Sequence, residues 1–187
     1  DKVLAYEQNL PPIGPSEPPY PLSALLMGAD IMQEWPWGQA VKNFVGDLIP
    51  EGWNIWKLYS RLVLGGDELL LRTPAVNRLN LGYHLVNHAD HSNPYAMGTG
   101  TVYGWPNEER GITRRDADSL TNGDRHSVVF TLGCSPNAFC VDSVSEHFMN
   151  NPAGGSVGYV GNSHVGYIDQ EVQDYQFFTS LFQDNLY

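Results

Sequence analysis

The sequence predicts an α/β fold in which a mostly parallel sheet is flanked by helices. Short apolar runs alternate along the chain with segments whose apolar residues recur at helical spacing. The runs Leu22–Gly28 and Ser127–Leu132 are apolar over most of their length, which is typical of strands buried on both faces. The stretch Ser127–Tyr167 reads as strand, loop, helix, glycine turn and second strand. Such alternation favours parallel strands with crossover helices covering both faces of the sheet.

The first 21 residues predict the end of a helix and a linker. Asp1–Asn9 contains helix-forming residues with apolar side chains at Val3, Leu4 and Tyr6, and Leu10–Pro21 holds six prolines. We therefore expect the globular domain to occupy residues 22–187, and we expect the chain to be a piece of a longer protein.

Three strands and two helices are expected in the first half of this domain. The strands are Leu22–Gly28, Trp53–Tyr59 and Gly82–Asn87. The helices are Gln39–Leu48, which has helical spacing of apolar residues, and Thr73–Asn80, with Thr73 as N-cap and Pro74 in the first turn.

The second half begins with a long polar stretch between His91 and Asp124, rich in Gly, Asn, Asp and Arg. A loop of this length in a compact domain is usually functional or disordered. After it we expect the strand Ser127–Leu132, the helix Ala138–Asn150, the strand Ser156–Val160 and the amphipathic helix Ile168–Leu186.

Composition limits the classes of function. A chain of 187 residues with 42% hydrophobic and 17% charged residues is expected to form one domain with a real core. Its net charge of −11 argues against nucleic acid or an anionic membrane as the main partner. No apolar run approaches the roughly 20 residues needed to span a bilayer, and Asp1-Lys2-Val3 does not begin a signal peptide.

The two cysteines and one histidine suggest nucleophilic chemistry. Cys134 follows a predicted strand directly and precedes a predicted helix, and His91 follows the preceding strand. Ligands of open α/β sheets bind at this edge, and a helix start favours thiolate over thiol. A neighbouring histidine promotes deprotonation and later protonates a leaving amine. By spacing alone, a buried structural cysteine is the commoner case, and a bridge to Cys140 would remove the thiolate.

The order of motifs carries a resemblance. The segment LVNHADHS (residues 85–92) places a histidine just after a strand that ends in Val-Asn. A later strand ends in Cys134 and is followed by a helix containing Glu146, by Gly154-Gly155 and by an apolar strand. This combination resembles the gingipain-type cysteine peptidases. The resemblance implies a caspase-like three-layer sandwich and a cysteine endopeptidase, with Cys134 as nucleophile and His91 as its partner.

The same resemblance implies partners, location and further site residues. The substrate would be a protein or peptide, no organic cofactor would be required, and the protein would be extracellular or on the cell surface, with further segments of its own precursor as partners. Backbone N–H groups at Gly133 and in the histidine loop, at Ser92, would hold the oxyanion. Asp90 and Ser92 stand where the family usually has glycines around the histidine.

Two acidic positions follow the first predicted strand. Asp30 lies close to where the resembled family places an acidic residue that orients the catalytic histidine, and the alternative is an exposed aspartate that caps the following turn. Glu34 and Trp35 are candidates for a substrate pocket that accepts a basic P1 residue. The alternative is that the tryptophans at 35 and 37 form core or subunit contacts and that Glu34 is solvated.

Metal sites are weaker candidates. Asp116, Asp118 and Asp124 have oxygen ligands at calcium-like intervals without the distal glutamate of an EF-hand, and members of the resembled family often bind structural calcium. His84, His88 and His91, together with Asp90, invite a zinc interpretation, but the favoured alternative is that His84 and His88 pack or hydrogen-bond locally. The competing class of function is a catalytically inactive relative with a binding or assembly role.

Overall fold

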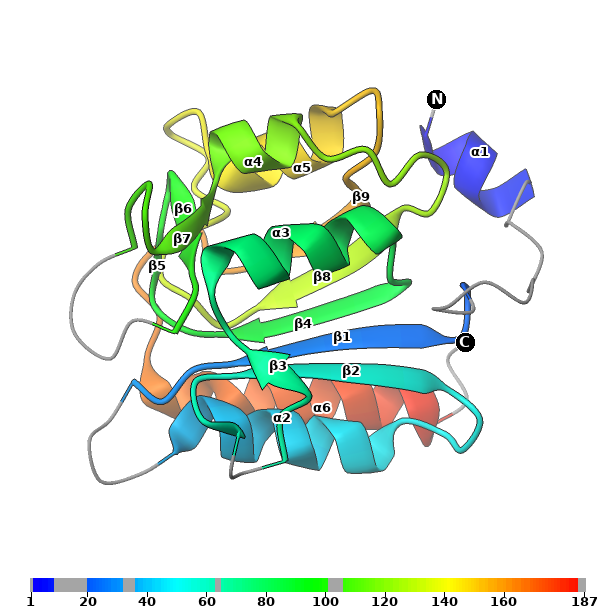
Figure 1. The fold of residues 1–187 in the computed structure, drawn as a ribbon, viewed down its shortest axis with the longest axis vertical. Coiled ribbons are helices and arrows are strands. Elements are labelled where there is room, and N and C mark those ends of the chain that lie inside the picture. Colours follow the sequence, from blue (N-terminus) through cyan, green and yellow to red (C-terminus); the bar gives the residue numbers. More distant parts are fainter. Residues whose placement is uncertain (1, 9–19, 32–35, 63–64, 101–105, 185–187) are drawn as a thin grey trace.

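The computed structural model describes residues 2–8, 20–31, 36–62, 65–100 and 106–184. Its main element is a six-stranded sheet in the order β3-β2-β1-β4-β8-β9, in which every neighbouring pair is parallel (Figure 1). The strands are β1 (Ser23–Gly28), β2 (Asn54–Tyr59), β3 (Glu68–Leu69), β4 (Leu85–Ala89), β8 (Ser127–Thr131) and β9 (Ser156–Val160). The predicted parallel sheet is confirmed.

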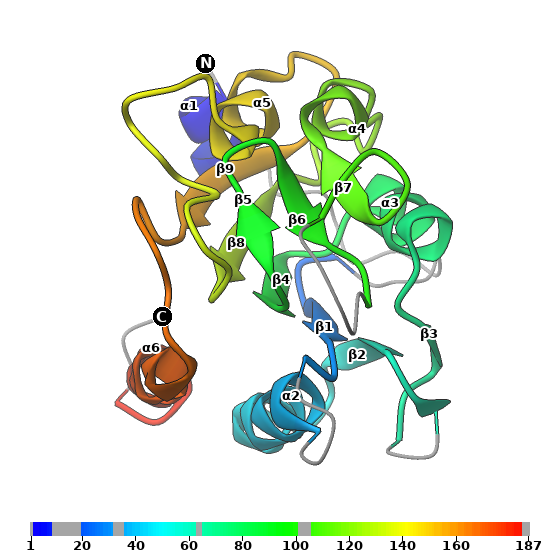
Figure 2. The same cartoon turned by 90° about the vertical axis from the view of Figure 1, so that its left-hand side faces the viewer.

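Helices cover both faces of this sheet (Figure 2). On one face lie α2 (Trp37–Leu48) and α6 (Glu171–Phe182); on the other lie α3 (Arg72–Leu81), α4 (Arg114–Asp118) and α5 (Val144–Asn150). A separate apolar core fills each side, because successive strand residues point to opposite faces: Leu26 packs in the core under α2 and α6, and Leu25 and Met27 pack in the other. The flanked sheet is the predicted α/β architecture.

Two further short helical elements lie outside these two layers of helices. Helix α1 (Lys2–Gln8) lies beside β9, and the 3-10 turn Ile168–Gln170 leads directly into α6. No helix in the described part of the chain is long and apolar enough to cross a membrane.

A buried polar trio joins α6 to the sheet. Lys42 on α2, Asn87 on β4 and Asp174 on α6 are all fully buried. The Nζ of Lys42 lies 2.6 Å from Oδ2 of Asp174 and donates to the amide oxygen of Asn87, whose Nδ2 donates to the other carboxylate oxygen of Asp174 at 2.6 Å. Burial lowers the pKa of Lys42, and the Asp174 carboxylate opposes that shift. The trio ties both helices of this face to the strand that leads to His91.

The polar stretch after His91 is more ordered than the sequence predicts. It forms a second, antiparallel sheet of β5 (Ser92–Asn93), β6 (Ala96–Gly98) and β7 (Gly111–Thr113), followed by α4. Met97 and Ile112 are fully buried in the core on the α3 side. Strands of two or three residues are too short to show alternation, so the expectation of a long loop was wrong here.

Two helix starts also differ from the prediction. Helix α5 begins at Val144, with Ser143 as N-cap, and residues 138–143 are not helical. Within the first turn of the helix, the hydroxyl of Ser145 donates to the side chain of Asn137 at 2.7 Å, which ties the helix start to the preceding loop. Helix α3 begins at Arg72 with Leu71 at the N-cap position, so Thr73 lies inside the first turn and does not cap it.

Candidate active site

A cleft of about 420 Å³ opens at the carboxyl edge of the sheet, the edge that faces the viewer in Figure 2. Its walls come from the loops that follow β1, β4 and β8, from the start of α2 and from the segment before α6. The lining residues are Ile31, Trp37, Asp90, His91, Leu132, Gly133, Cys134, Gly166 and Tyr167. Strands β1 and β4 are neighbours although β2 and β3 lie on the far side of β1, and such a reversal of strand order is the usual ligand position in open α/β sheets.

Cys134 is a free, partly buried cysteine three residues beyond the end of β8. Its Sγ lies 3.7 Å from the carbonyl oxygen of Gly166, the geometry of a weak hydrogen bond from the thiol. The next residue, Ser135, has a φ of 55°, an uncommon conformation for a residue with a side chain, and its N–H donates to the carbonyl of His164 at 2.8 Å. The backbone around the thiol is therefore held in a specific and strained form.

The correction to α5 changes one electrostatic argument. Because α5 starts at Val144, it begins ten residues after Cys134 and spans only seven residues. A helix N-terminus exerts its field within about its first turn. The predicted contribution of this helix to forming the thiolate is therefore unsupported, and His91 is left as the candidate activator.

His91 lines the same cleft, two residues beyond the end of β4. Burial lowers its pKa, so its imidazole is mostly neutral at neutral pH and can accept a proton. Strands β4 and β8 are directly paired, with His88 opposite Thr131. This pairing brings the loops that carry His91 and Cys134 to one cleft.

Asp90 and Ser92, the two residues that flank His91, are both buried. The carboxylate of Asp90 turns toward the backbone: Oδ1 accepts the N–H of His91 at 2.6 Å, and Oδ2 accepts the N–H of Gly100 at 2.7 Å. The Ser92 side chain packs against Gly133, where an added Cβ would lie 1.9 Å from its Oγ. Its hydroxyl finds no hydrogen-bond partner among the described residues.

Gly133 and the residues around it are fixed by groups that sequence reasoning missed. The N–H of Gly133 donates to Oγ1 of Thr131 at 3.2 Å. The side chain of Asn162, after β9, donates to the carbonyl oxygens of Leu132 at 3.2 Å and Gly133 at 2.9 Å. The N–H of Gly133, predicted to hold the oxyanion, therefore already has a partner within the chain. An asparagine just beyond a strand end was the available signal for the role of Asn162.

Asp30 follows β1, one residue before Ile31 of the cleft wall, and is 1% exposed. Its Oδ2 is 2.6 Å from Nη2 of Arg61, while its backbone N–H donates to Oγ of Ser60 at 3.0 Å. The contact with Arg61 is an ion pair outside hydrogen-bond geometry, and neither carboxylate oxygen receives a hydrogen bond from a described residue. The structure therefore places an arginine, not His91, against this carboxylate, and an orienting role for Asp30 stays a prediction.

The predicted substrate residues Glu34 and Trp35 lie outside the described residues. The neighbouring Trp37 does line the cleft, and its ring N–H donates to the carboxylate of Glu171 at the start of α6. Together with Ile31 and Leu132 it gives the described walls an apolar character.

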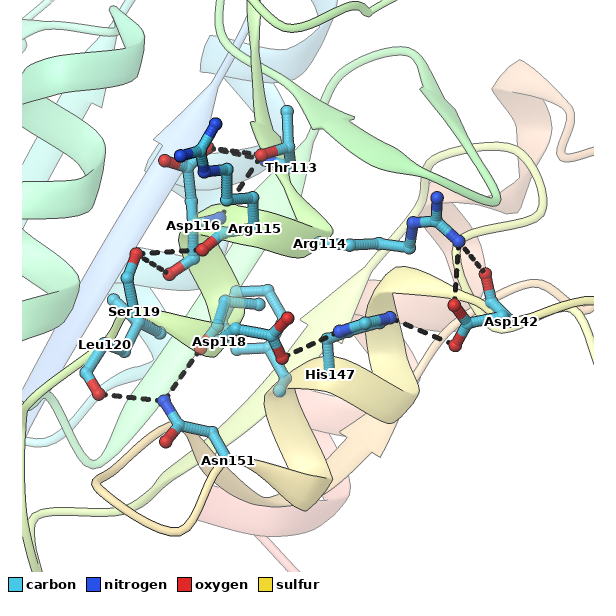
Figure 3. A network of polar contacts seen from close by, with 12 residues as sticks. Thr113, Arg114, Arg115, Asp116, Asp118, Ser119, Leu120, Asp142, His147 and Asn151 are labelled. Carbon is cyan, nitrogen blue, oxygen red and sulfur yellow. Dashed lines mark hydrogen bonds and ion pairs between the residues drawn. The ribbon is translucent and has the colours of Figure 1, made fainter.

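Two of the three aspartates predicted to bind calcium, Asp116 and Asp118, have separate partners in Figure 3. Asp116 caps α4 with Thr113 and pairs with Arg72, its Oδ1 lying 2.6 Å from Nη2. Asp118 lies 2.7 Å from Nδ1 of His147, and Asp124 is exposed in a loop. Within the described ranges, no group of three or more His, Cys, Asp or Glu side chains is arranged to hold a metal ion. Calcium binding stays a prediction that this arrangement does not favour.

The histidines considered for zinc have other partners. His84 shares hydrogen bonds with the carbonyl of Pro21, 2.7 Å away, and with the hydroxyl of Tyr6. His88 is held by Thr131 and Gly98. Local hydrogen bonding, the alternative to a zinc site, therefore accounts for both rings.

A parallel sheet flanked by helices, with a cysteine and a histidine in one cleft beyond adjacent strands, is the arrangement expected of a cysteine peptidase domain. The sequence model of peptidase family C25 matches residues 1–187. The chain belongs to this family.

Solved structures share the fold at low sequence identity. The crystal structure of the Arg specific cysteine proteinase gingipain R superposes with a TM-score of 0.70 and 18% identity, covering 100% of this chain and 42% of that one. A structure described only as a protease gives a TM-score of 0.66, 20% identity and coverages of 91% and 34%. The complex of Porphyromonas gingivalis RgpB pro- and mature domains gives 0.61, 16%, 82% and 35%. The chain thus spans less than half the length of each, and a comparison with curated proteins found no match.

Proposed function

We propose that this chain contributes the reacting pair of a cysteine endopeptidase, with Cys134 as nucleophile and His91 as general acid and base. The observation that carries the proposal is that both residues line one cleft, beyond the carboxyl ends of the directly paired strands β4 and β8. The neutral form of His91, favoured by burial, is the form that removes a proton from a thiol.

The reaction follows from this pair. His91 takes the proton of the Cys134 thiol, and the thiolate attacks the scissile carbonyl carbon to form a tetrahedral oxyanion. When the carbon–nitrogen bond breaks, His91 gives its proton to the leaving amine and a thioester remains. Water, deprotonated by His91, then attacks the thioester, and the returning proton regenerates the thiol.

Cys134 supplies the backbone donor that we assign to the oxyanion. The N–H of His91 is donated to Asp90 and that of Gly133 to Thr131. The N–H of Cys134 itself lies beside the attacking sulfur and is available for the substrate oxygen. A second donor from Ser92 stays part of the proposal.

An active-site-directed thiol probe tests the proposal. Cys140 is exposed and reacts with any thiol reagent, so the experiment uses a Cys140→Ser background. We expect rapid labelling of Cys134 that falls to the rate of a free thiol in His91→Ala. A peptide library then reports the P1 preference, including whether Glu34 and Trp35 select Arg or Lys. Equally fast labelling of Cys134 in the background protein and in the His91→Ala variant would contradict the Cys–His mechanism.

A second function has one observation in its favour. Asp90 and Ser92 place a carboxylate and a hydroxymethyl group around His91 where the family has glycines, and Ser92 crowds Gly133. In that case the chain is an inactive domain with a binding or assembly role. Labelling of Cys134 no faster than a free thiol, together with no cleavage of the library, would select this function.

Family membership supports a proposal on location and partners. We propose that the protein acts outside the cell or on its surface and that it associates with other segments of its own precursor, as in the complex of RgpB pro- and mature domains. Intact mass and terminal sequencing of the native protein recovered from culture medium and cell surface test both points. Recovery in the cytoplasmic fraction alone contradicts the proposed location.

A further inference from the structure

His88 lies on β4 and is completely buried, and both of its ring nitrogens have partners. Nε2 lies 2.9 Å from the carbonyl oxygen of Gly98, and Nδ1 lies 2.7 Å from Oγ1 of Thr131. A carbonyl oxygen only accepts, so Nε2 carries the proton. Burial, aided by the charge of Lys42, lowers the pKa of His88 to about 4 against the opposing Gly98 contact. The ring is therefore neutral at neutral pH, and Nδ1 is an acceptor.

This tautomer fixes the direction of the Thr131 hydroxyl. Because Nδ1 of His88 accepts, Oγ1 of Thr131 donates to it, and the oxygen's lone pairs remain free to accept the N–H of Gly133 at 3.2 Å. Thr131 is 2% exposed. A single chain of hydrogen bonds therefore runs from the β6 strand through β4 and β8 to the loop that carries Cys134.

Asn162 holds the carbonyl groups of the same loop. Its Nδ2 donates to the Gly133 oxygen at 2.9 Å, and its other proton is shared between Oε1 of Gln170 at 2.9 Å and the Leu132 oxygen at 3.2 Å. The peptide between Leu132 and Gly133 therefore has partners at its C=O and, through Thr131, at its N–H. The following peptide is fixed at the Gly133 oxygen. In a trans peptide the N–H points away from the C=O, so this contact sets the direction of the Cys134 N–H.

We infer that His88, Thr131 and Asn162 are positioning residues that aim the Cys134 N–H at the oxyanion. No described residue accepts a hydrogen bond from this N–H. None of the three lines the cleft, so they act through the Gly133–Cys134 peptide and do not touch the substrate. The inference rests on the proposed function and assigns the roles through which the chain holds its oxyanion donor.

A pair of substitutions at Thr131 tests the catalytic consequence. Thr131→Val keeps the volume and removes the hydroxyl, whereas Thr131→Ser keeps the hydroxyl. Removing an oxyanion donor costs about 10²–10³ in kcat, and a misdirected donor should cost less. We expect kcat of the valine variant to fall by about 10- to 100-fold with KM within about twofold, and the serine variant to recover most of the loss.

Nuclear magnetic resonance of the labelled protein tests the hydrogen bonds independently of cleavage. The Gly133 amide proton should exchange slowly with solvent in the wild type and in Thr131→Ser, and fast in Thr131→Val. The nitrogen shifts of the His88 ring should show that Nδ1 is unprotonated. Equal protection in all three proteins overturns the relay. Lost protection with unchanged kcat overturns its catalytic role. A wild type that cleaves nothing overturns the proposed function, and amide exchange then decides the relay alone.

A second variant covers the case in which Thr131→Val does not fold. Asn162→Asp keeps the shape of the side chain but offers no donor to the Leu132 and Gly133 carbonyls. It should lower kcat with little change in KM, as Thr131→Val does. An unchanged kcat in a folded Asn162→Asp protein contradicts the positioning role of Asn162.

Discussion

The hydroxyl of Ser92 packs directly against Gly133, so the loop of His91 and the loop of Cys134 are in contact. This contact leaves no space for a side chain at position 133. Gly133 does not have a positive φ, so steric contact and not backbone conformation requires a glycine at this position. The side chain of Ser92 in one loop thus requires a glycine at position 133 in the other.

Replacing Ser92 should stabilise the fold. A buried hydroxyl without a partner costs about 1–3 kcal/mol, and Ser92→Ala removes it without adding atoms. We expect the free energy of unfolding to rise by about 1 kcal/mol, or about 2–4 °C in Tm, measured by denaturant and thermal unfolding. A lower Tm would show that the hydroxyl has a stabilising contact.

Gly133→Ala should be destabilising, by about 1–3 kcal/mol, because its Cβ would overlap the Ser92 side chain. The matched control is Gly133→Ala combined with Ser92→Gly, which removes that overlap and leaves the Asp90 carbonyl oxygen 3.0 Å away. A double-mutant cycle should give a favourable coupling between the two substitutions. Additive effects would contradict direct contact.

The buried Lys42–Asp174 pair should respond asymmetrically to substitution. Asp174→Ala leaves an unpaired buried ammonium group and should cost about 3–5 kcal/mol of stability. Replacing all three members of the trio with apolar residues, as in Lys42→Met, Asn87→Leu and Asp174→Leu, should cost much less, because no buried polar group is left without a partner. Denaturant unfolding of the wild type and the two variants checks this order, and a triple variant as unstable as Asp174→Ala contradicts it.

His88 should make the fold sensitive to acid. Its pKa falls from 6.5 to about 4 on folding, chiefly through burial, so the unfolded state binds more protons between these values. The contribution of His88 to the free energy of unfolding is fully present above pH 6.5. About 3 kcal/mol of it should be lost as the pH falls to about 4. Unfolding at a series of pH values measures the slope, which should be shallower in His88→Gln. An identical slope in both proteins assigns the acid sensitivity elsewhere.

His147 should show the opposite dependence. Burial lowers its pKa, but hydrogen bonds to Asp118 and Asp142 and their charges outweigh this, and the net direction is upward (Figure 3). The contribution of His147 to the free energy of unfolding is therefore present below pH 6.5, and it is lost as the pH rises through the raised pKa of His147. Both carboxylates are more than half exposed, so the contribution is small and screened by salt. A resonance titration should give a pKa above 6.5 that drops in Asp118→Asn with Asp142→Asn.

The sequence could predict the sheet because each of its longer strands is a continuous or alternating apolar run, and β1, β4, β8 and β9 appear close to their predicted positions. The rule that ligands bind at the carboxyl edge also placed Cys134 and His91 on one side of the molecule, and the structure brings both to one cleft. The family resemblance carried by the order of these motifs is confirmed by the family model, which matches residues 1–187.

The features that the sequence does not predict depend on contacts between residues that are distant in sequence. The short strands β5, β6 and β7 are held by pairing and by burial of Met97 and Ile112, which no local pattern of two or three residues reveals. The start of α5 is set by hydrogen bonds of Ser145 to the preceding loop. Asp30 has an arginine beside it because β2 delivers Arg61 to the same edge, a pairing visible only once the strand order is known.

The two outer edges of the sheet are not equivalent. Strand β3 can fray without touching the cleft, since the loops of His91 and Cys134 extend from interior strands. Strand β9 is also an edge, yet it leads to Asn162, which clamps Leu132 and Gly133, and to Gly166, which faces the thiol. A partial opening confined to β9 would release both contacts while the other five strands stay paired. In such a local unfolding of β9, the cleft would lose its geometry while most of the domain stays folded.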